Sequence, residues 1–327
     1  MAFQKSVLAS AVLCALSGGA HAQEATKTLA PVVVTADPFG SNEGAAILTP
    51  ARVLSGDDMR DKLGDSLGDT LMREPGVNAS GFSAGASRPI IRGLEGPRIK
   101  ILQNGMGSGD LSSISNDHAV GTSALSAQQI EILRGPATLL YGSGAIGGAV
   151  NIVNGRIPTQ LEPQATGEVE LRGGSADDSA LFAFSADRSA GKIGLHIDGS
   201  MLRAGDYRIP GNSAVDGSGD RGKLSFSGNR EDSLGFGATL VESWGHVGAS
   251  IGQTDRLYGI HGRDENAKID LCQFRFDVDS LVKSPLPGFD ALRIKLGHND
   301  YRHTELEDGS DPHVKFTNRS FESRWEL

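Results

Sequence analysis

Residues 130–153 read IEILRGPATLLYGSGAIGGAVNIV, and this stretch is the most distinctive in the chain. Gly135 and Pro136 turn the chain out of a short strand-like run, and the glycines that follow allow tight backbone paths. One interpretation is a glycine-rich loop that cradles phosphate. Such a loop carries Gly-Lys-Ser/Thr and opens a helix, and no such tripeptide follows here. The phosphate-loop interpretation therefore lacks its essential residues.

A second block of similar character lies upstream, where residues 88–105 read RPIIRGLEGPRIKILQNG. Short β-type runs alternate with glycine turns from residue 89 to residue 154. Before them, four apolar residues recur at intervals of four and predict one buried helix face: Met59, Leu63, Leu67 and Leu71. Ser55 is the expected N-cap, and residues 64–66 are expected to split the helix in two. We predict a small α+β domain over residues 45–155.

After residue 156 the apolar residues alternate with more polar ones, as Ile193, Leu195 and Ile197 do. This period of two is typical of strands with one lipid-facing and one water-facing side, and also of soluble β-sandwiches. The predicted strands, about eight, lie near residues 166–173, 178–188, 191–205, 233–241, 244–256, 268–282, 290–304 and 312–327. Short turns are expected near residues 189, 242 and 285, and longer loops over 206–232, 257–267 and 305–311.

The composition limits the classes of function. A net charge of −9 argues against nucleic acid as a partner, because binding a phosphate backbone requires an excess of basic residues. Past the N-terminus, no apolar run approaches the roughly 20 residues of a membrane helix. If the chain crosses a membrane, it does so with strands. A metal-dependent hydrolase would need a motif such as His-Glu-x-x-His, and since none is present we expect no enzymatic activity.

The N-terminal residues resemble an export signal. Lys5 precedes an apolar core, and the small residues around His21 form a cleavage site, which predicts a signal peptide over residues 1–22. Residues 23–44 form a flexible segment that contains three consecutive valines, a strand suited to pairing with a partner by β-augmentation. Removing the signal leaves Cys272 as the one cysteine, so no disulfide can form within the chain.

These features occur in a recognisable order. An export signal, a valine-rich segment similar to a TonB box, and the blocks at 88–105 and 130–153 together resemble the TonB-dependent outer-membrane receptors. The resemblance implies an α+β plug domain over 45–155, followed by the antiparallel strands of a transmembrane β-barrel. The full barrel of the family has 22 strands, so residues 156–327 would hold about the first eight. The pattern breaks off at residue 327, and we expect a truncated product or a fragment.

The resemblance also assigns partners and contact residues. The TonB protein would pair with the valine-rich segment through five residues: Leu29, Val32, Val33, Val34 and Thr35. Arg92 and Arg134 would form contacts between plug and barrel, with solvated surface charges as the alternative. Outer-membrane lipid would surround the barrel, and we expect the receptor to be a monomer.

A clue to the cargo lies in the glycine- and serine-rich segment 104–120, which contains Asp117 and His118. In a loop both side chains can turn toward one ion, and imidazole and carboxylate are ordinary zinc ligands. Calcium prefers mostly oxygen ligands, and copper(I) prefers sulfur. A loop histidine with ordinary hydrogen bonds is the alternative. From these two residues alone, the sequence leaves both interpretations open.

The same segment, with residues 258–260 and 297–305, is similar to the zinc-uptake receptors of the ZnuD type. That resemblance implies zinc as the transported ligand, with Asp117 and His118 as its first ligands and no catalytic cofactor. His261, His303 and His313 are candidate auxiliary ligands. The loop after residue 258 departs from the group, because it carries one histidine rather than a histidine-rich run. A receptor for a siderophore, haem or copper complex, or a truncated non-functional product, is therefore the alternative.

Overall fold

A computed structural model describes residues 51–214, 219–261, 266–307 and 310–327. These residues all belong to the second of two compact units, 33–327. The expected signal peptide, the segment 23–44 and the five TonB-pairing residues lie outside the described residues. Among the described helices, none is long and apolar enough to cross a membrane.

The first part of the unit is the predicted α+β domain. Its elements are β1 (Ala51–Ser55), α2 (Gly56–Arg60), α3 (Leu67–Leu71), β2 (Val77–Ala79), β3 (Pro89–Ile91), η1 (Gly96–Arg98), β4 (Ile99–Gln103), β5 (Met106–Gly107), β6 (Gln129–Leu133), η2 (Pro136–Tyr141), η3 (Ser143–Ala145) and β7 (Gly148–Val153). Five strands form a sheet in the order β1-β6-β7-β4-β5. All neighbours in it are antiparallel except β4 and β7. Strands β2 and β3 form a separate small hairpin.

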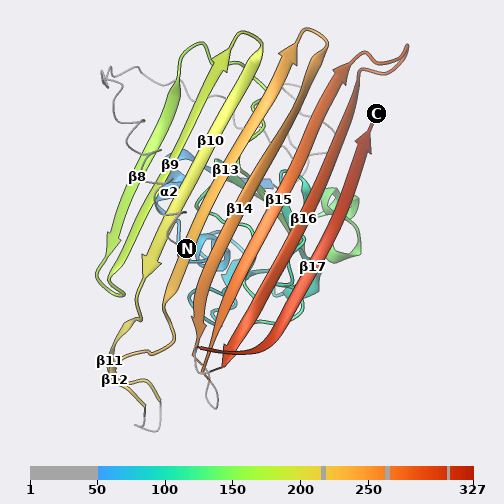
Figure 1. Ribbon diagram of the computed structural model, residues 1–327. Helices are drawn as coiled ribbons and strands as arrows, with labels where there is room; N and C mark the ends of the chain where they lie inside the picture. The colour runs from blue at the N-terminus through green and yellow to red at the C-terminus, as the bar shows by residue number, and fades with distance from the viewer. Residues whose placement is uncertain (1–50, 215–218, 262–265, 308–309) are drawn as a thin grey trace. The chain divides into compact units, whose positions relative to one another are not determined.

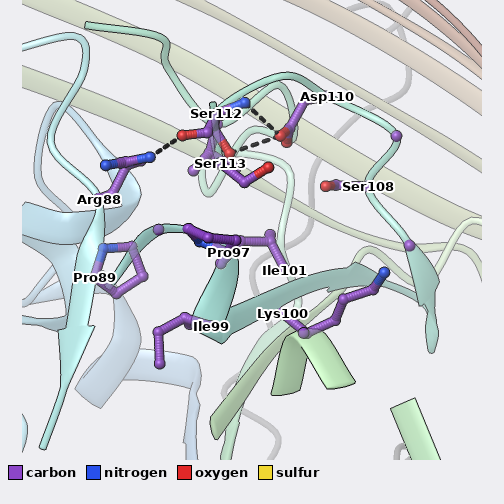
Figure 2. Close-up of a pocket in the computed structure, with 15 residues that line it drawn as sticks. Arg88, Pro89, Pro97, Ile99, Lys100, Ile101, Ser108, Asp110, Ser112 and Ser113 are labelled. Carbon is purple, nitrogen blue, oxygen red and sulfur yellow. Dashed lines mark hydrogen bonds between the residues drawn. The ribbon is translucent and has the colours of Figure 1, made fainter. Parts of the chain in front are cut away.

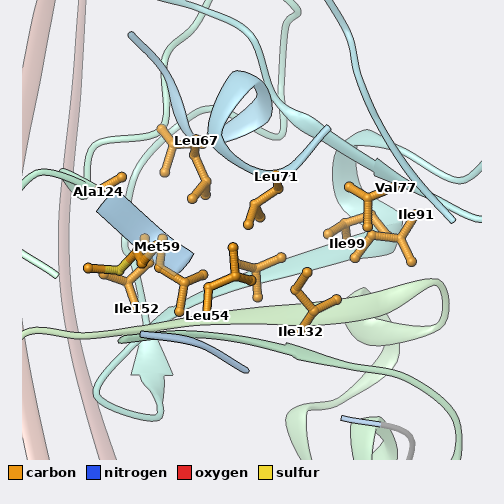
Figure 3. Close-up of a cluster of buried hydrophobic side chains, with 13 residues drawn as sticks. Leu54, Met59, Leu67, Leu71, Val77, Ile91, Ile99, Ala124, Ile132 and Ile152 are labelled. Atoms are coloured by element: carbon orange, nitrogen blue, oxygen red, sulfur yellow. The ribbon is translucent and has the colours of Figure 1, made fainter. Parts of the chain in front are cut away.

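The predicted helix is confirmed, including its division into two. Met59 of α2 and Leu67 and Leu71 of α3 pack with Leu54 and Ile132 of the sheet in the main core of the plug (Figure 3). The Ser66 side chain caps α3 by accepting a hydrogen bond from the Asp69 amide at 3.2 Å. The apolar face therefore determines where the helices lie on the sheet.

The distinctive stretch at 130–153 contributes two neighbouring strands and the connection between them. Gly135 ends β6 with a φ of 80°, a backbone conformation that residues other than glycine seldom adopt. Two short 3₁₀ turns, η2 and η3, follow before β7 begins. The glycines are thus used for turns, in agreement with the rejection of a phosphate loop.

The second part is a sheet of long strands: β8 (Thr166–Gly174), β9 (Ser179–Ala190), β10 (Ile193–Ala204), β13 (Asn229–Glu242), β14 (Gly245–Ile260), β15 (Ala267–Lys283), β16 (Ala291–Glu307) and β17 (Asp311–Glu326). They pair in sequence order and are antiparallel throughout (Figure 1). The long connection after β10 holds a small ribbon of β11 (Arg208–Asn212) and β12 (Arg221–Lys223). The predicted strands are confirmed.

Two predicted loop lengths are wrong. The connection between β16 and β17 is expected to be long, but the strands reach Glu307 and resume at Asp311. The connection between β15 and β16, expected to be a short turn near residue 285, spans residues 284–290. Cross-strand pairing continues into polar sequence at the end of β16, because a ladder needs backbone partners and not apolar side chains.

The two faces of the long-stranded sheet differ in chemistry. Register places Ile197, Phe236, Ile251 and Phe276 side by side across four strands, and all four are exposed. Residues of the opposite parity are buried and mostly polar. An apolar outer band with a polar interior is the pattern of an outer-membrane barrel wall.

The polar face contacts the plug. Lys295 donates to the carbonyl of Asn104 at 2.7 Å, Gln273 to that of Ser108 at 2.9 Å, and Asn299 to that of Gly109 at 2.8 Å. Side chains of β15 and β16 thus hold the backbone of plug residues 104–109. This segment leads directly into the loop that carries the candidate ligands.

One prediction concerns Glu74, a buried plug carboxylate that accepts from Arg52 of β1 and from Lys62, each at 2.7 Å. Burial raises the pKa of Glu74, but the bonds from Lys62 and Arg52 outweigh it, so the net pKa lies below the ordinary value of 4.5. A lowered pKa stabilises the folded state above the unfolded pKa, and the gain is lost as the pH falls through the folded pKa. We expect Glu74→Gln to destabilise the plug by roughly 2 kcal/mol at neutral pH.

The difference between the two proteins should shrink as the pH falls below about 4.5, because a protonated Glu74 resembles glutamine. Hydrogen exchange of residues 51–55 against pH measures it, since Arg52 ties β1 to Glu74. Comparing the two proteins cancels the titration of Asp65 and Asp69, whose pKa values burial raises. Equal exchange at neutral pH would contradict the prediction.

Candidate metal centre

The loop after β5 carries the predicted ligands Asp117 and His118, and its own side chains close it. The Asp110 carboxylate accepts from the Ser112 amide at 3.0 Å and from the Gly121 amide at 3.0 Å. Both ends of the loop are therefore tied to one side chain. Arg88 donates to the Ser112 carbonyl and to Asn116, and so holds the middle of the loop.

A cavity of about 240 Å³ lies beside this loop (Figure 2). Arg88, Asp110 and Ser112 line it together with Lys100, and the hydrogen bonds from Arg88 to Ser112 and from Ser112 to Asp110 run along its wall. Because the guanidinium of Arg88 is already engaged by the loop, its visible role is to support the loop. His118 does not line this cavity.

His118 is 2% exposed, and its two ring nitrogens have different neighbours. Nδ1 lies 3.1 Å from the carbonyl oxygen of Leu111, and because a carbonyl only accepts, Nδ1 carries the hydrogen. Nε2 lies 3.3 Å from Oε1 of Glu305, another acceptor. A nitrogen lone pair facing a carboxylate requires a cation between them, either a proton or a metal ion.

The barrel contributes the other members of the group. His303 and Glu305 lie two residues apart on β16, so both project toward the plug from one face of the strand. His303 is fully buried, with Nδ1 2.8 Å from the hydroxyl of Tyr301. Its Nε2 is buried and has no hydrogen-bond partner among the described residues, and it lies 3.8 Å from Oε1 of Glu305.

These three side chains form one cluster. One ligand atom from each of His118, His303 and Glu305 lies within 4.8 Å of the other two. In a tetrahedral zinc site with bonds of about 2.0–2.1 Å, neighbouring ligand atoms are about 3.3–3.4 Å apart. The separation of 3.3 Å between His118 and Glu305 already has this value, and His303 is within a small movement of it. The cluster can hold a divalent cation with two nitrogens and one oxygen.

Neighbouring groups define the edges of the cluster. Phe316 of β17 packs against both imidazoles, with ring centroids 5.1 Å from His118 and 4.7 Å from His303. Asp117 accepts from the Ser115 hydroxyl, and its Oδ1 is 3.9 Å from Nε2 of His118. Asp117 is thus the nearest further carboxylate, at the edge of the cluster.

The other candidate histidines lie elsewhere. His261 is bonded through Nδ1 to the Ser225 carbonyl at 2.9 Å, and His313 is exposed beside Glu307 at 3.5 Å. Neither belongs to the cluster. Glu305 was considered only as part of an acidic loop. Its spacing from His303 was the available signal, because residues two apart share one face of a strand.

The two arginines expected to join plug and barrel lie in the plug. Arg134 donates to the Pro75 carbonyl at 2.7 Å, and burial followed by the nearby charge of Arg92 lowers its pKa. Within the described ranges neither arginine forms an ion pair with the barrel strands, and their role stays a prediction. An ion pair that does join the two parts links Arg60 to Glu168 at 2.7 Å.

A plug domain followed by antiparallel barrel strands, with polar groups between the two parts, defines the class of plugged outer-membrane receptors. Residues 45–149 match the family model described as TonB-dependent Receptor Plug Domain. A probable TonB-dependent siderophore receptor, PirA of Acinetobacter baumannii, is 28% identical over 63% of this chain and 29% of its own length. The vitamin B12 transporter BtuB of Vibrio vulnificus is 31% identical over 59% of this chain and 31% of its own length.

These matches support membership of the TonB-dependent receptor family, with residues 45–149 as its plug domain. Among solved structures, the copper transporter OprC superposes with a TM-score of 0.62 at 17% identity, over 78% of this chain and 38% of that one. That likeness shows the fold. The chain spans less than a third of the length of the two sequence relatives.

Proposed function

We propose that this chain is part of an outer-membrane receptor that takes up zinc in a TonB-energised step. The cluster of His118, His303 and Glu305 would hold the ion between plug and barrel, with Asp117 available as a further ligand. The TonB partnership through residues 29–35, the outer-membrane location and a monomeric state are parts of the same proposal. The plug match and the transporter relatives support them.

The observation that carries the proposal is the unpartnered Nε2 of His303. A buried polar atom without a partner costs about 1–3 kcal/mol, and natural structures seldom leave one without a reason. Here it faces a second imidazole, whose centroid is 4.4 Å away, and a carboxylate. A bound cation would satisfy all three groups at once. A proton would satisfy only one pair of them.

The size of the cluster favours an ion over a chelate. Organic ligands occupy cavities of about 300–1,000 Å³. The three ligand atoms lie within 4.8 Å of one another, and none of these residues lines either of the two cavities found in the described chain. An organic complex such as a siderophore has no space among these atoms.

The donor set favours zinc among the ions. Imidazole nitrogens with a carboxylate oxygen suit zinc, whereas copper(I) is selected by sulfur. Cys272 alternates with Leu271, which pairs with His303, so its sulfur projects to the opposite face of the sheet. Uptake of a siderophore, cobalamin or copper complex, as the names of the relatives suggest, is the competing function.

The discriminating experiment uses the complete receptor in detergent. Binding of Zn²⁺, Cu²⁺ and a ferric siderophore is measured by calorimetry, and zinc uptake is measured in cells with and without TonB. We expect saturable zinc binding with a stoichiometry near one at this cluster, and uptake that needs TonB. Binding of the ferric siderophore or of copper, without zinc, would assign the receptor to the competing cargo.

A further inference from the structure

We propose that two buried barrel tyrosines, Tyr258 of β14 and Tyr301 of β16, are positioning residues for the ion. Tyr258 would place the plug ligand, and Tyr301 would orient the barrel ligand. The inference rests on the proposed function, because it explains how the cluster is assembled from two separate parts of the chain. Both side chains are fully buried in the same apolar cluster, which also contains Ala119 beside His118.

Tyr258 holds the plug backbone on both sides of His118. Its hydroxyl accepts from the Ala119 amide at 2.8 Å and donates to the Asp117 carbonyl at 2.9 Å. One barrel hydroxyl therefore brackets the residue whose imidazole enters the cluster. Arg256, also on β14, reaches the next carbonyl, that of Val120, at 3.4 Å. The position of His118 relative to the barrel thus depends on β14, although its imidazole faces β16.

Tyr301 acts on the hydrogen position in the ring of His303. Its hydroxyl lies 2.8 Å from Nδ1 of His303. When Nδ1–H donates to that hydroxyl oxygen, the lone pair of Nε2 is directed at Glu305 and His118, as a metal ligand requires. Ligating histidines usually donate their other ring N–H in this way. The Leu111 carbonyl provides the same support for His118.

Removing either hydroxyl should weaken the ion without unfolding the site. Loss of such an outer partner costs about 10–100-fold in metal affinity. Phenylalanine keeps the ring and its apolar contacts, so the substitution isolates the hydroxyl. A purely structural role for the tyrosines predicts unchanged zinc affinity in Tyr258→Phe and Tyr301→Phe.

The test compares zinc affinity in the complete receptor and in three phenylalanine variants. Tyr207→Phe is the matched control, because the Tyr207 hydroxyl donates to the plug residue Asp65 at 2.7 Å and does not touch the cluster. We expect affinities about 10–100-fold weaker for Tyr258→Phe and Tyr301→Phe, and a wild-type affinity for Tyr207→Phe. Wild-type affinity in the first two variants would overturn the inference.

A spectroscopic measurement separates the two tyrosines and does not depend on how well a variant folds. Nitrogen-15 spectra of the histidine-labelled, zinc-loaded wild-type receptor should show Nδ1–H and a metal-bound Nε2 for both ligands. A metal-bound Nδ1 on His303 would overturn the role of Tyr301. If His303→Ala binds zinc as tightly as the parent, the proposed function fails. If His303→Ala loses zinc while both tyrosine variants retain it, only the positioning inference fails.

Discussion

Replacing His303 with alanine is expected to weaken zinc binding by more than about 100-fold, the upper end of the loss seen when only an outer partner is removed. The substitution deletes one of two nitrogen ligands and leaves His118 and Glu305, too few to hold zinc tightly. Because the described cluster draws on both plug and barrel, His118→Ala should have a similar effect. Calorimetry on the complete receptor measures both losses.

His313→Ala is the matched control for this prediction. His313 lies on β17 in the same region of the sheet, but it is exposed and outside the cluster. Its removal tests whether any nearby histidine contributes by general attraction of the ion. A loss for His313→Ala equal to that for His303→Ala would argue against a defined site.

The second large effect is expected at the ion pair that fastens the connection between plug and barrel. Arg156 directs two nitrogens at the carboxylate of Asp198 on β10, at 2.6 and 2.8 Å, and both side chains are buried. Gly235 and Gly252 leave the space that the guanidinium fills, since a Cβ at either position would lie 2.0 Å from it. Asp198→Asn leaves a buried guanidinium without its counter-charge, which costs about 3–5 kcal/mol.

Thermal and denaturant unfolding of the complete receptor measure this loss. The control is Asp232→Asn, which removes the partner of Arg203 from an exposed pair at 2.7 Å. Exposed pairs contribute about 0–1 kcal/mol, so the control should unfold almost like the parent. Equal destabilisation by the two substitutions would mean that the burial of Arg156 does not matter for stability.

Local patterns in the sequence were sufficient for the elements of the fold. Four-residue spacing located the helices at Met59 and Leu71, and two-residue alternation located the long strands. Both patterns arise from side-chain directions within one element, so neighbouring residues carry them. The loop lengths were harder to predict, because strands continue wherever a neighbouring backbone is available to pair with, as β16 does up to Glu307.

The sequence by itself determined the α+β plug, the antiparallel strands after it and His118 as a candidate ligand. It presented three further histidines on equal terms and could not rank them. Only the tertiary structure brought Glu305 to His118, from 187 residues away along the chain, and set His303 beside them. The physical reason is that the docking of plug against barrel depends on contacts between distant segments, such as Tyr258 with Asp117 and Ala119, and no local period encodes such contacts.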